Sequence, residues 1–173
     1  MTGHPRVVDE SSRHAAAALD GRVDERPILF AYDGFEDAKA AIRQAGRQFG
    51  SGRAAIVLTV WKPFKAMPFA SAPVAPAGLE ANVEREARRV ADEGARLARL
   101  SGFQAEPIAE RGDSVWQRIV QSAEEHDAAI VVLGAHGRTR TRLVAMGSVA
   151  AATAQQTTRP VLIVHASPRR RAA

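Results

Sequence analysis

Three glycines and a serine in the last third of the sequence have a spacing that suits phosphate binding. Two residues separate Gly134 from Gly137, and nine more lead to the pair Gly147-Ser148. Glycine lets backbone N–H groups approach an anion closely, and the start of a helix adds about half a positive charge. The hydroxyl of Ser148 is a further donor. The segment predicts a phosphate-binding loop, with an ordinary strand–helix connection that contains glycines as the alternative.

Three arginines bring full positive charges to the same loop: Arg138, Arg140 and Arg142. They alternate along the chain, so we do not expect all of them to reach one ligand. The alternative is that they keep an exposed loop in solution. The chain has no Gly-Lys-Ser/Thr, which excludes a Walker A loop, and the glycine spacing is not the Gly-x-Gly-x-x-Gly of dinucleotide-binding folds.

His136 is the remaining side chain of the loop with chemistry to offer. Histidine exchanges protons near neutral pH, but neither a serine nucleophile nor an orienting carboxylate is marked beside it in the sequence, although distant residues could meet it. Loop packing or contact with phosphate is the favoured role, and we assign no catalytic residue. The five histidines, at positions 4, 14, 126, 136 and 165, show no metal-ligand spacing, so we predict no metal site.

Short apolar strands and amphipathic helices alternate along the chain and must position this loop. We expect strands at 27–32, 54–60, 103–109, 128–133 and 159–165. We expect helices at 35–49, at 79–100, from Asp113 or Ser114 to His126, and after Ser148. Pro107 interrupts the third strand and places it at a sheet edge. The proline-rich segment 61–78 is expected to form a flap over the end of the second strand.

This alternation predicts a single Rossmann-like α/β domain, with a five-stranded parallel sheet covered by helices on both faces. In such sheets ligands bind beyond the carboxyl ends of the strands, where the strand order reverses. With the order 3-2-1-4-5, the first and fourth strands lie side by side at that reversal. Asp33 follows the first strand and Gly134 the fourth, so the two should face one crevice. The alternative for Asp33 is a helix N-cap or turn residue.

The composition suits one cytoplasmic domain. The chain has 173 residues, of which 46% are hydrophobic and 25% charged, and it has no cysteine. We see no signal peptide and no apolar run near the roughly 20 residues that span a bilayer. The net charge is +5, but three arginines at 169–171 contribute to it and only 5% of residues are aromatic, so nucleic-acid binding is not expected. We predict a flexible extension over residues 1–25, the domain over 26–167 and a basic tail over 168–173.

From residue 27 to residue 165 the sequence resembles the universal stress protein family. The glycine spacing is that of its ATP-binding members, and the similarity extends to Asp33, to Thr59-Val60 and to the closing run 158–164. The resemblance implies that Asp33 contacts the ribose and that Val60 lies by the adenine. It also implies that the phosphates are bound at Gly134, Gly137, Gly147, Ser148 and Val149, and we place His136 and Arg138 with them.

Two departures from the family pattern leave the identity of the nucleotide open. Phe35 stands where members commonly carry serine or threonine, which removes a polar group from the ribose side. The run 139–142 contains two arginines where smaller or apolar residues are common.

The resemblance implies a cytosolic ATP-binding stress-response protein that acts as a sensor or regulatory module on a protein partner. Any magnesium is expected to arrive with the nucleotide and to keep most of its waters. The alternatives are slow ATP hydrolysis or phosphotransfer, a scaffold that binds no nucleotide, and a module for a monophosphate or cyclic nucleotide. The apolar strand Val161–Val164 would lie at the sheet edge, so we predict a homodimer that pairs antiparallel through it.

Overall fold

The computed structural model of the chain describes residues 24–49, 51–63, 78–137 and 146–166. The predicted extension, apart from its last two residues, lies outside this part of the chain, and so do the basic tail and most of the predicted flap. Arg138, Arg140 and Arg142 also lie outside it.

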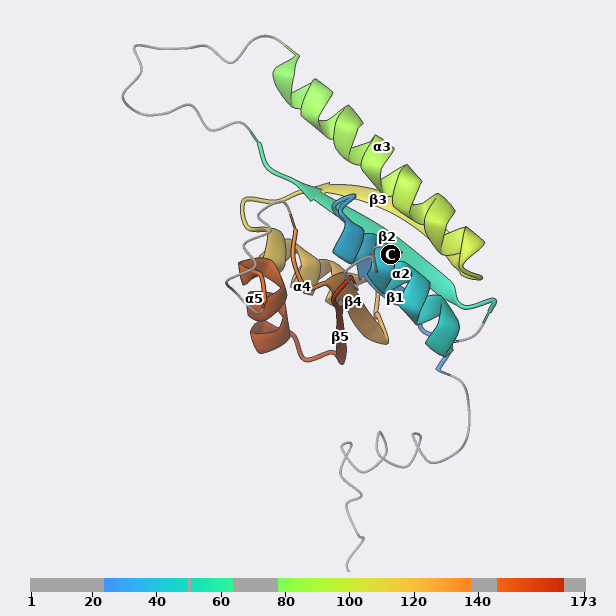
Figure 1. Cartoon of the computed structure of the whole chain (residues 1–173). Coiled ribbons are helices and arrows are strands. Elements are labelled where there is room, and N and C mark those ends of the chain that lie inside the picture. Colours follow the sequence, from blue (N-terminus) through green and yellow to red (C-terminus); the bar gives the residue numbers. More distant parts are fainter. Residues whose placement is uncertain (1–23, 50, 64–77, 138–145, 167–173) are drawn as a thin grey trace, which may run out of the picture.

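The described residues form one parallel sheet of five strands in the order β3-β2-β1-β4-β5 (Figure 1). The predicted α/β class and strand order are therefore confirmed. The strands are β1 (Ile28–Ala31), β2 (Ala54–Trp61), β3 (Gln104–Arg111), β4 (Ile130–Gly134) and β5 (Val161–Val164).

Two pairs of helices cover the two faces of the sheet (Figure 1). One face is covered by α2 (Glu36–Phe49) and α3 (Leu79–Leu100), and the other by α4 (Val115–Glu125) and α5 (Ser148–Gln156). None of these helices is long and apolar enough to cross a membrane.

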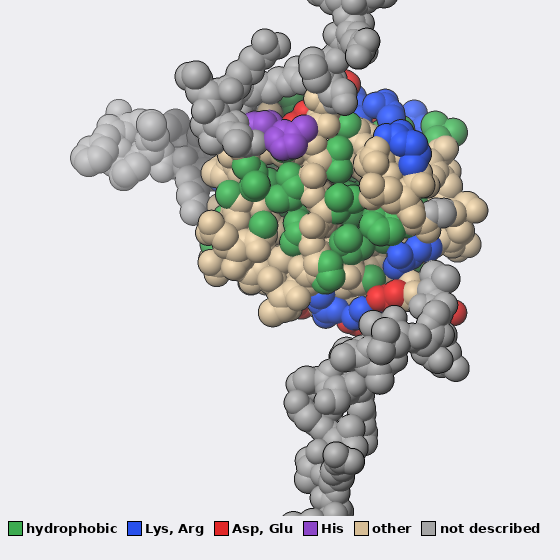
Figure 2. Space-filling model, turned by 60° about the horizontal axis from the view of Figure 1, so that its bottom comes forward, with side chains coloured by type: hydrophobic (Ala, Val, Ile, Leu, Met, Phe, Trp, Pro, Cys, Tyr) green, Lys and Arg blue, Asp and Glu red, His purple; other side chains and the backbone are tan. Residues whose placement is uncertain are grey.

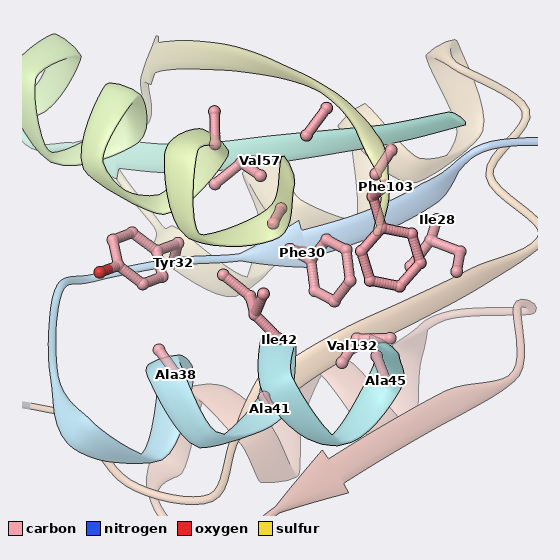
Figure 3. Close-up of a cluster of buried hydrophobic side chains, with 14 residues drawn as sticks. Ile28, Phe30, Tyr32, Ala38, Ala41, Ile42, Ala45, Val57, Phe103 and Val132 are labelled. Atoms are coloured by element: carbon pink, nitrogen blue, oxygen red, sulfur yellow. The ribbon is translucent and has the colours of Figure 1, made fainter. Parts of the chain in front are cut away.

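The central strands are buried on both sides because helices cover both faces of the sheet, and successive side chains of a strand point to opposite faces. Phe30 points toward α2 and α3, where its ring meets that of Phe103 edge to face at 5.2 Å between centroids (Figure 3). Its neighbour Leu29 points the other way and packs with Ile119 of α4. Two apolar clusters on one sheet therefore hold the carboxyl ends of the strands in fixed positions.

The third strand is longer than the sequence predicts. It was expected to end at Ala109 and runs to Arg111, with Pro107 inside it and paired with Val57. The prediction that β3 lies at an edge is confirmed. Proline has no backbone N–H to donate. On an edge strand its nitrogen can face away from the sheet, so no hydrogen bond to β2 is lost and the pairing continues past Pro107.

Helices α4 and α5 begin close to where the sequence predicts them. Ser114 is the N-cap residue of α4, yet its side chain makes no capping hydrogen bond. The last helix begins at Ser148, with Gly147 as its N-cap.

Candidate functional site

A cavity of about 860 Å³ opens beyond the carboxyl ends of β1, β2 and β4 and reaches the start of α5. Asp33 and Gly134 both line it, as the predicted strand order requires. Val60, His136, Gly137, Gly147, Ser148 and Val149 line it too. The structure thus brings together every predicted binding residue that it describes, and Arg138 lies outside the described residues. The volume is in the usual range for small-molecule sites.

Asp33 is held against the glycine loop. Its Oδ1 accepts a hydrogen bond from the backbone N–H of Phe35 at 3.1 Å, so Asp33 is a turn residue as well as a cavity residue. On the other side, a Cβ added to Gly137 would lie 2.6 Å from Oδ2 of Asp33. Glycine at 137 therefore makes room for the carboxylate. A carboxylate fixed in this way can accept hydrogen bonds from sugar hydroxyls.

The wall formed by β2 and the helices is largely apolar. Val60 is half-buried, and Val83 of α3 and Val115 and Ile119 of α4 line the same cavity. Thr59 donates from its hydroxyl to the carbonyl of Tyr32 at 3.0 Å, so its polar group is satisfied within the protein. An apolar wall of this kind suits a flat ring.

Tyr32 adds an oriented phenol beside the cavity. Its hydroxyl donates to Oε1 of Glu93 at 3.0 Å, and the same oxygen lies 3.1 Å from the ammonium of Lys39. Burial, together with the bond to Glu93, raises the pKa of Tyr32 far above its usual value. The hydrogen bond from Lys39 lowers the pKa of Glu93. At neutral pH the phenol is therefore neutral and the carboxyl group charged.

Gly134 serves packing more directly than ligand binding. It is the last residue of β4, and a Cβ there would lie 2.6 Å from the backbone nitrogen of Ala38 and 2.6 Å from the carbonyl carbon of Asp37. Only a residue without a side chain lets the first turn of α2 approach the strand this closely. The close approach brings the start of α2 to the edge of the cavity.

Gly147 has an ordinary backbone conformation. Its φ is −68° and its ψ is 155°, values that any residue can take. The N–H of Gly147 donates to the carbonyl of Ala135 at 2.8 Å, which ties the start of α5 to the end of β4. Ser148 and Val149 follow in the first turn, where helix N–H groups lack partners within the helix and favour an anion.

The environment of His136 contains a residue that sequence reasoning missed. That residue is Asp37. The Nδ1 of His136 lies 3.1 Å from Oδ2 of Asp37, and the backbone N–H of His136 donates to the same oxygen at 3.1 Å. Asp37 is buried and comes from a position 99 residues earlier in the chain. An acidic residue in the first turn of a helix is common because it interacts well with the helix dipole, so the local pattern gave no signal.

His165 lies next to this pair. Its ring centroid is 5.5 Å from that of His136, at an angle of 59° between the ring planes. The histidines show no metal-ligand spacing along the sequence, but the fold brings two of them together with an aspartate from three separate segments of the chain.

The comparison with protein-family models gives a match over most of the chain. The model of the universal stress protein family matches residues 25–165. No curated protein matches the chain significantly.

Solved structures share the fold at low sequence identity. The structure of hypothetical protein MJ0577 is 23% identical, with a TM-score of 0.70 over 83% of this chain and 98% of its own. A universal stress protein in complex with cAMP is 23% identical, with a TM-score of 0.59 over 83% of this chain and 98% of its own. The universal stress protein from Archaeoglobus fulgidus in complex with dAMP is 20% identical, with a TM-score of 0.59 over 83% and 99% of the two chains.

Proposed function

This chain belongs to the universal stress protein family, and from that premise we propose that it binds an adenine nucleotide, ATP, in the cavity at the ends of β1, β2 and β4. The observation that carries the proposal is the composition of that one cavity. It combines a fixed carboxylate, an apolar wall and the first turn of a helix. A nucleotide needs these same three environments, for its sugar, its base and its phosphates.

The proposed pose assigns each part of the nucleotide to described residues. Asp33 accepts hydrogen bonds from the ribose hydroxyls, since a carboxylate beside the phosphates would be repelled. The base lies by Val60 on the apolar wall. The phosphates lie against Gly137 and against the N–H groups at the start of α5, where Gly147 and Ser148 line the cavity.

Two structural neighbours support an adenine nucleotide as the ligand class. One is a complex with cAMP and the other a complex with dAMP. The preference for ATP rests on the family resemblance of the glycine spacing and on the positive charge of the loop between Gly137 and Gly147. Magnesium would arrive with the triphosphate, bound mainly to phosphate oxygens and water.

We place the nucleotide in a regulatory role. In the proposed cycle, a cytosolic homodimer binds ATP, and binding changes the surface that the protein offers to a regulatory protein partner in the stress response. A ligand shifts such an equilibrium only by its difference in affinity for the two states, so the proposed role requires different partner affinities with and without ATP.

The test starts with the ligand that the protein carries. The purified protein is denatured and the released small molecules are identified by mass spectrometry, and the ligand-free protein is then titrated with ATP, AMP, cAMP and adenosine. We expect an adenine nucleotide in the released fraction and the tightest binding for ATP. If AMP or cAMP bound most tightly, that nucleotide and not ATP would be the ligand. If none of the four compounds bound, the proposal would be overturned.

A further inference from the structure

Three potential metal ligands converge at the carboxyl ends of β4 and β5. Asp37 lies in the first turn of α2, His136 follows β4 and His165 follows β5. One carboxylate oxygen of Asp37 and one ring nitrogen of each histidine all lie within 4.8 Å of one another. The sequence places these residues far apart, so their meeting is a property of the fold.

The carboxylate of Asp37 is fixed in place by the backbone. Its Oδ2 accepts a hydrogen bond from the N–H of His136 at 3.1 Å, and its Oδ1 accepts one from the N–H of Ala166 at 3.2 Å. The side chain is only 6% exposed. One buried negative charge is thus held at the ends of two strands, between the residues that carry the two imidazoles.

The cluster can be reached from solvent on the side of the two histidines. The side chain of His136 is 17% exposed and His165 is an exposed residue. Figure 2 shows histidine side chains together on one face of the molecule. An ion can therefore reach the cluster from outside without passing through the nucleotide cavity. Neither Asp37 nor His165 lines that cavity.

We propose that Asp37, His136 and His165 bind a divalent transition-metal ion of the zinc type, with water in the fourth position. Two imidazoles and one carboxylate are a donor set typical of Zn²⁺, and they suit it better than Mg²⁺ or Ca²⁺, which prefer oxygen ligands alone. Around a tetrahedral ion with bonds of about 2.0–2.1 Å, ligand atoms lie about 3.3 Å apart.

The geometry needs one small adjustment to reach that arrangement. Nδ1 of His136 and Oδ2 of Asp37 are already 3.1 Å apart. The widest separation in the cluster is bounded by 4.8 Å, and rotation of the exposed His165 side chain can close it. The bound ion would join the end of β5 to the loop residue His136, which borders the nucleotide cavity.

Calorimetric titration of the full, nucleotide-free chain with zinc chloride tests the site. We expect one tight equivalent that excess magnesium does not displace. His165→Asn and Asp37→Asn should each weaken that equivalent by more than about tenfold, since even residues that only support a ligand contribute tenfold or more to metal affinity. His165→Asn should melt like the wild type without metal, because the residue is exposed.

His126→Asn is the matched control, because it removes a histidine that lies at the end of α4 and outside the cluster. It should bind zinc as the wild type does, and all of these variants retain His4 and His14. Cobalt added in place of zinc should give the visible absorption of a four-coordinate ion in the wild type and in His126→Asn, but not in His165→Asn. Absence of the tight equivalent, or its unchanged survival in either His165→Asn or Asp37→Asn, would overturn the proposal. Because no nucleotide is present, that failure would leave the proposed function untouched.

Discussion

At the scale of single residues, Asp33 and Gly137 act as a pair. The carboxylate of Asp33 is held by the N–H of Phe35 on one side and packs against the backbone of Gly137 on the other. A ligand that bonds to this carboxylate finds it already in position, which reduces the entropy lost on binding. Both residues are therefore places where one small change should alter affinity and leave the fold intact.

Asp33→Ala should weaken ATP binding by about 1.5–3 kcal/mol, roughly ten- to a hundredfold in affinity, because hydrogen bonds to a charged acceptor are lost. Calorimetry on the wild type and the variant measures the change. Asp33→Asn is the control, since the amide oxygen can keep the turn with Phe35 while the charge is removed. Equal affinities for wild type and Asp33→Ala would reject the ribose contact.

Gly137→Ala should reduce ATP affinity about tenfold by acting through Asp33, because the added Cβ would lie 2.6 Å from Oδ2 and must displace the carboxylate. In an Asp33→Ala background the same change should have little further effect, since its target is gone. A full additional loss in the double variant would show that position 137 acts on the ligand directly.

At the scale of elements, glycines set the distances between helices and strands. Gly134 lets α2 approach β4. Gly94 lets α3 approach β2 and the chain just after β1: a Cβ at 94 would lie 2.6 Å from the ring of Tyr32 and 2.7 Å from Val57. Tyr32 also lines the cavity, so this contact connects the packing of α3 to the site.

Gly94→Ala should destabilise the protein by about 1–3 kcal/mol through overpacking, although alanine has the higher helix propensity. Urea denaturation followed by circular dichroism measures the free energy of unfolding. Asp92→Ala, at an exposed position of the same helix, is the control and should change it by less than about 0.5 kcal/mol. A Gly94→Ala variant as stable as the control would contradict the close packing of α3.

The sequence predicts what local patterns encode and misses what depends on distant contacts. Its periodicity gives α3 with the bounds observed, Leu79 to Leu100, because the apolar stripe and the terminal Ser101-Gly102 are local signals. The extent of β3 beyond Ala109 depends on the pairing with β2, which no pattern within β3 contains.

The candidate site divides in the same way. The positions of Asp33 and Gly134 at the cavity follow from strand order, and the structure confirms both. The role of Gly134 in packing requires knowing that α2 lies against it. Asp37 accepts a hydrogen bond from Ala166, 129 positions later, and the histidines beside it are also distant in the sequence, so no local signal marks the cluster of Asp37, His136 and His165.

At the scale of the whole molecule, β5 forms one edge of the sheet, and no other described strand pairs with its outer side. The carbonyls of Pro160 and Val164 accept hydrogen bonds from β4, and in a parallel ladder alternate residues face the same neighbour. Val161 and Ile163 therefore turn their backbone groups to the open edge. All four residues of β5 are only half-buried.

We predict that two copies pair antiparallel along β5, so light scattering at micromolar concentration should give twice the chain mass of 18.5 kDa. Ile163→Pro removes the outward N–H and should give a monomer. Ile163→Ala loses the same side chain but keeps the N–H, so it should remain a dimer. A wild-type mass of one chain would end the dimer proposal.

The central claim is that the start of α5 forms part of a nucleotide site, and one calorimetric titration tests it most directly. ATP is added to the wild type and to Gly147→Val. The variant has a compatible backbone angle, and its Cβ would lie 3.1 Å from the carbonyl of Ala135, so only a small shift is needed and the fold should survive. Its branched side chain would fill the space proposed for phosphate. We predict that the wild type binds ATP and that the variant melts cooperatively without binding it. A folded Gly147→Val that binds ATP as the wild type does would contradict the account.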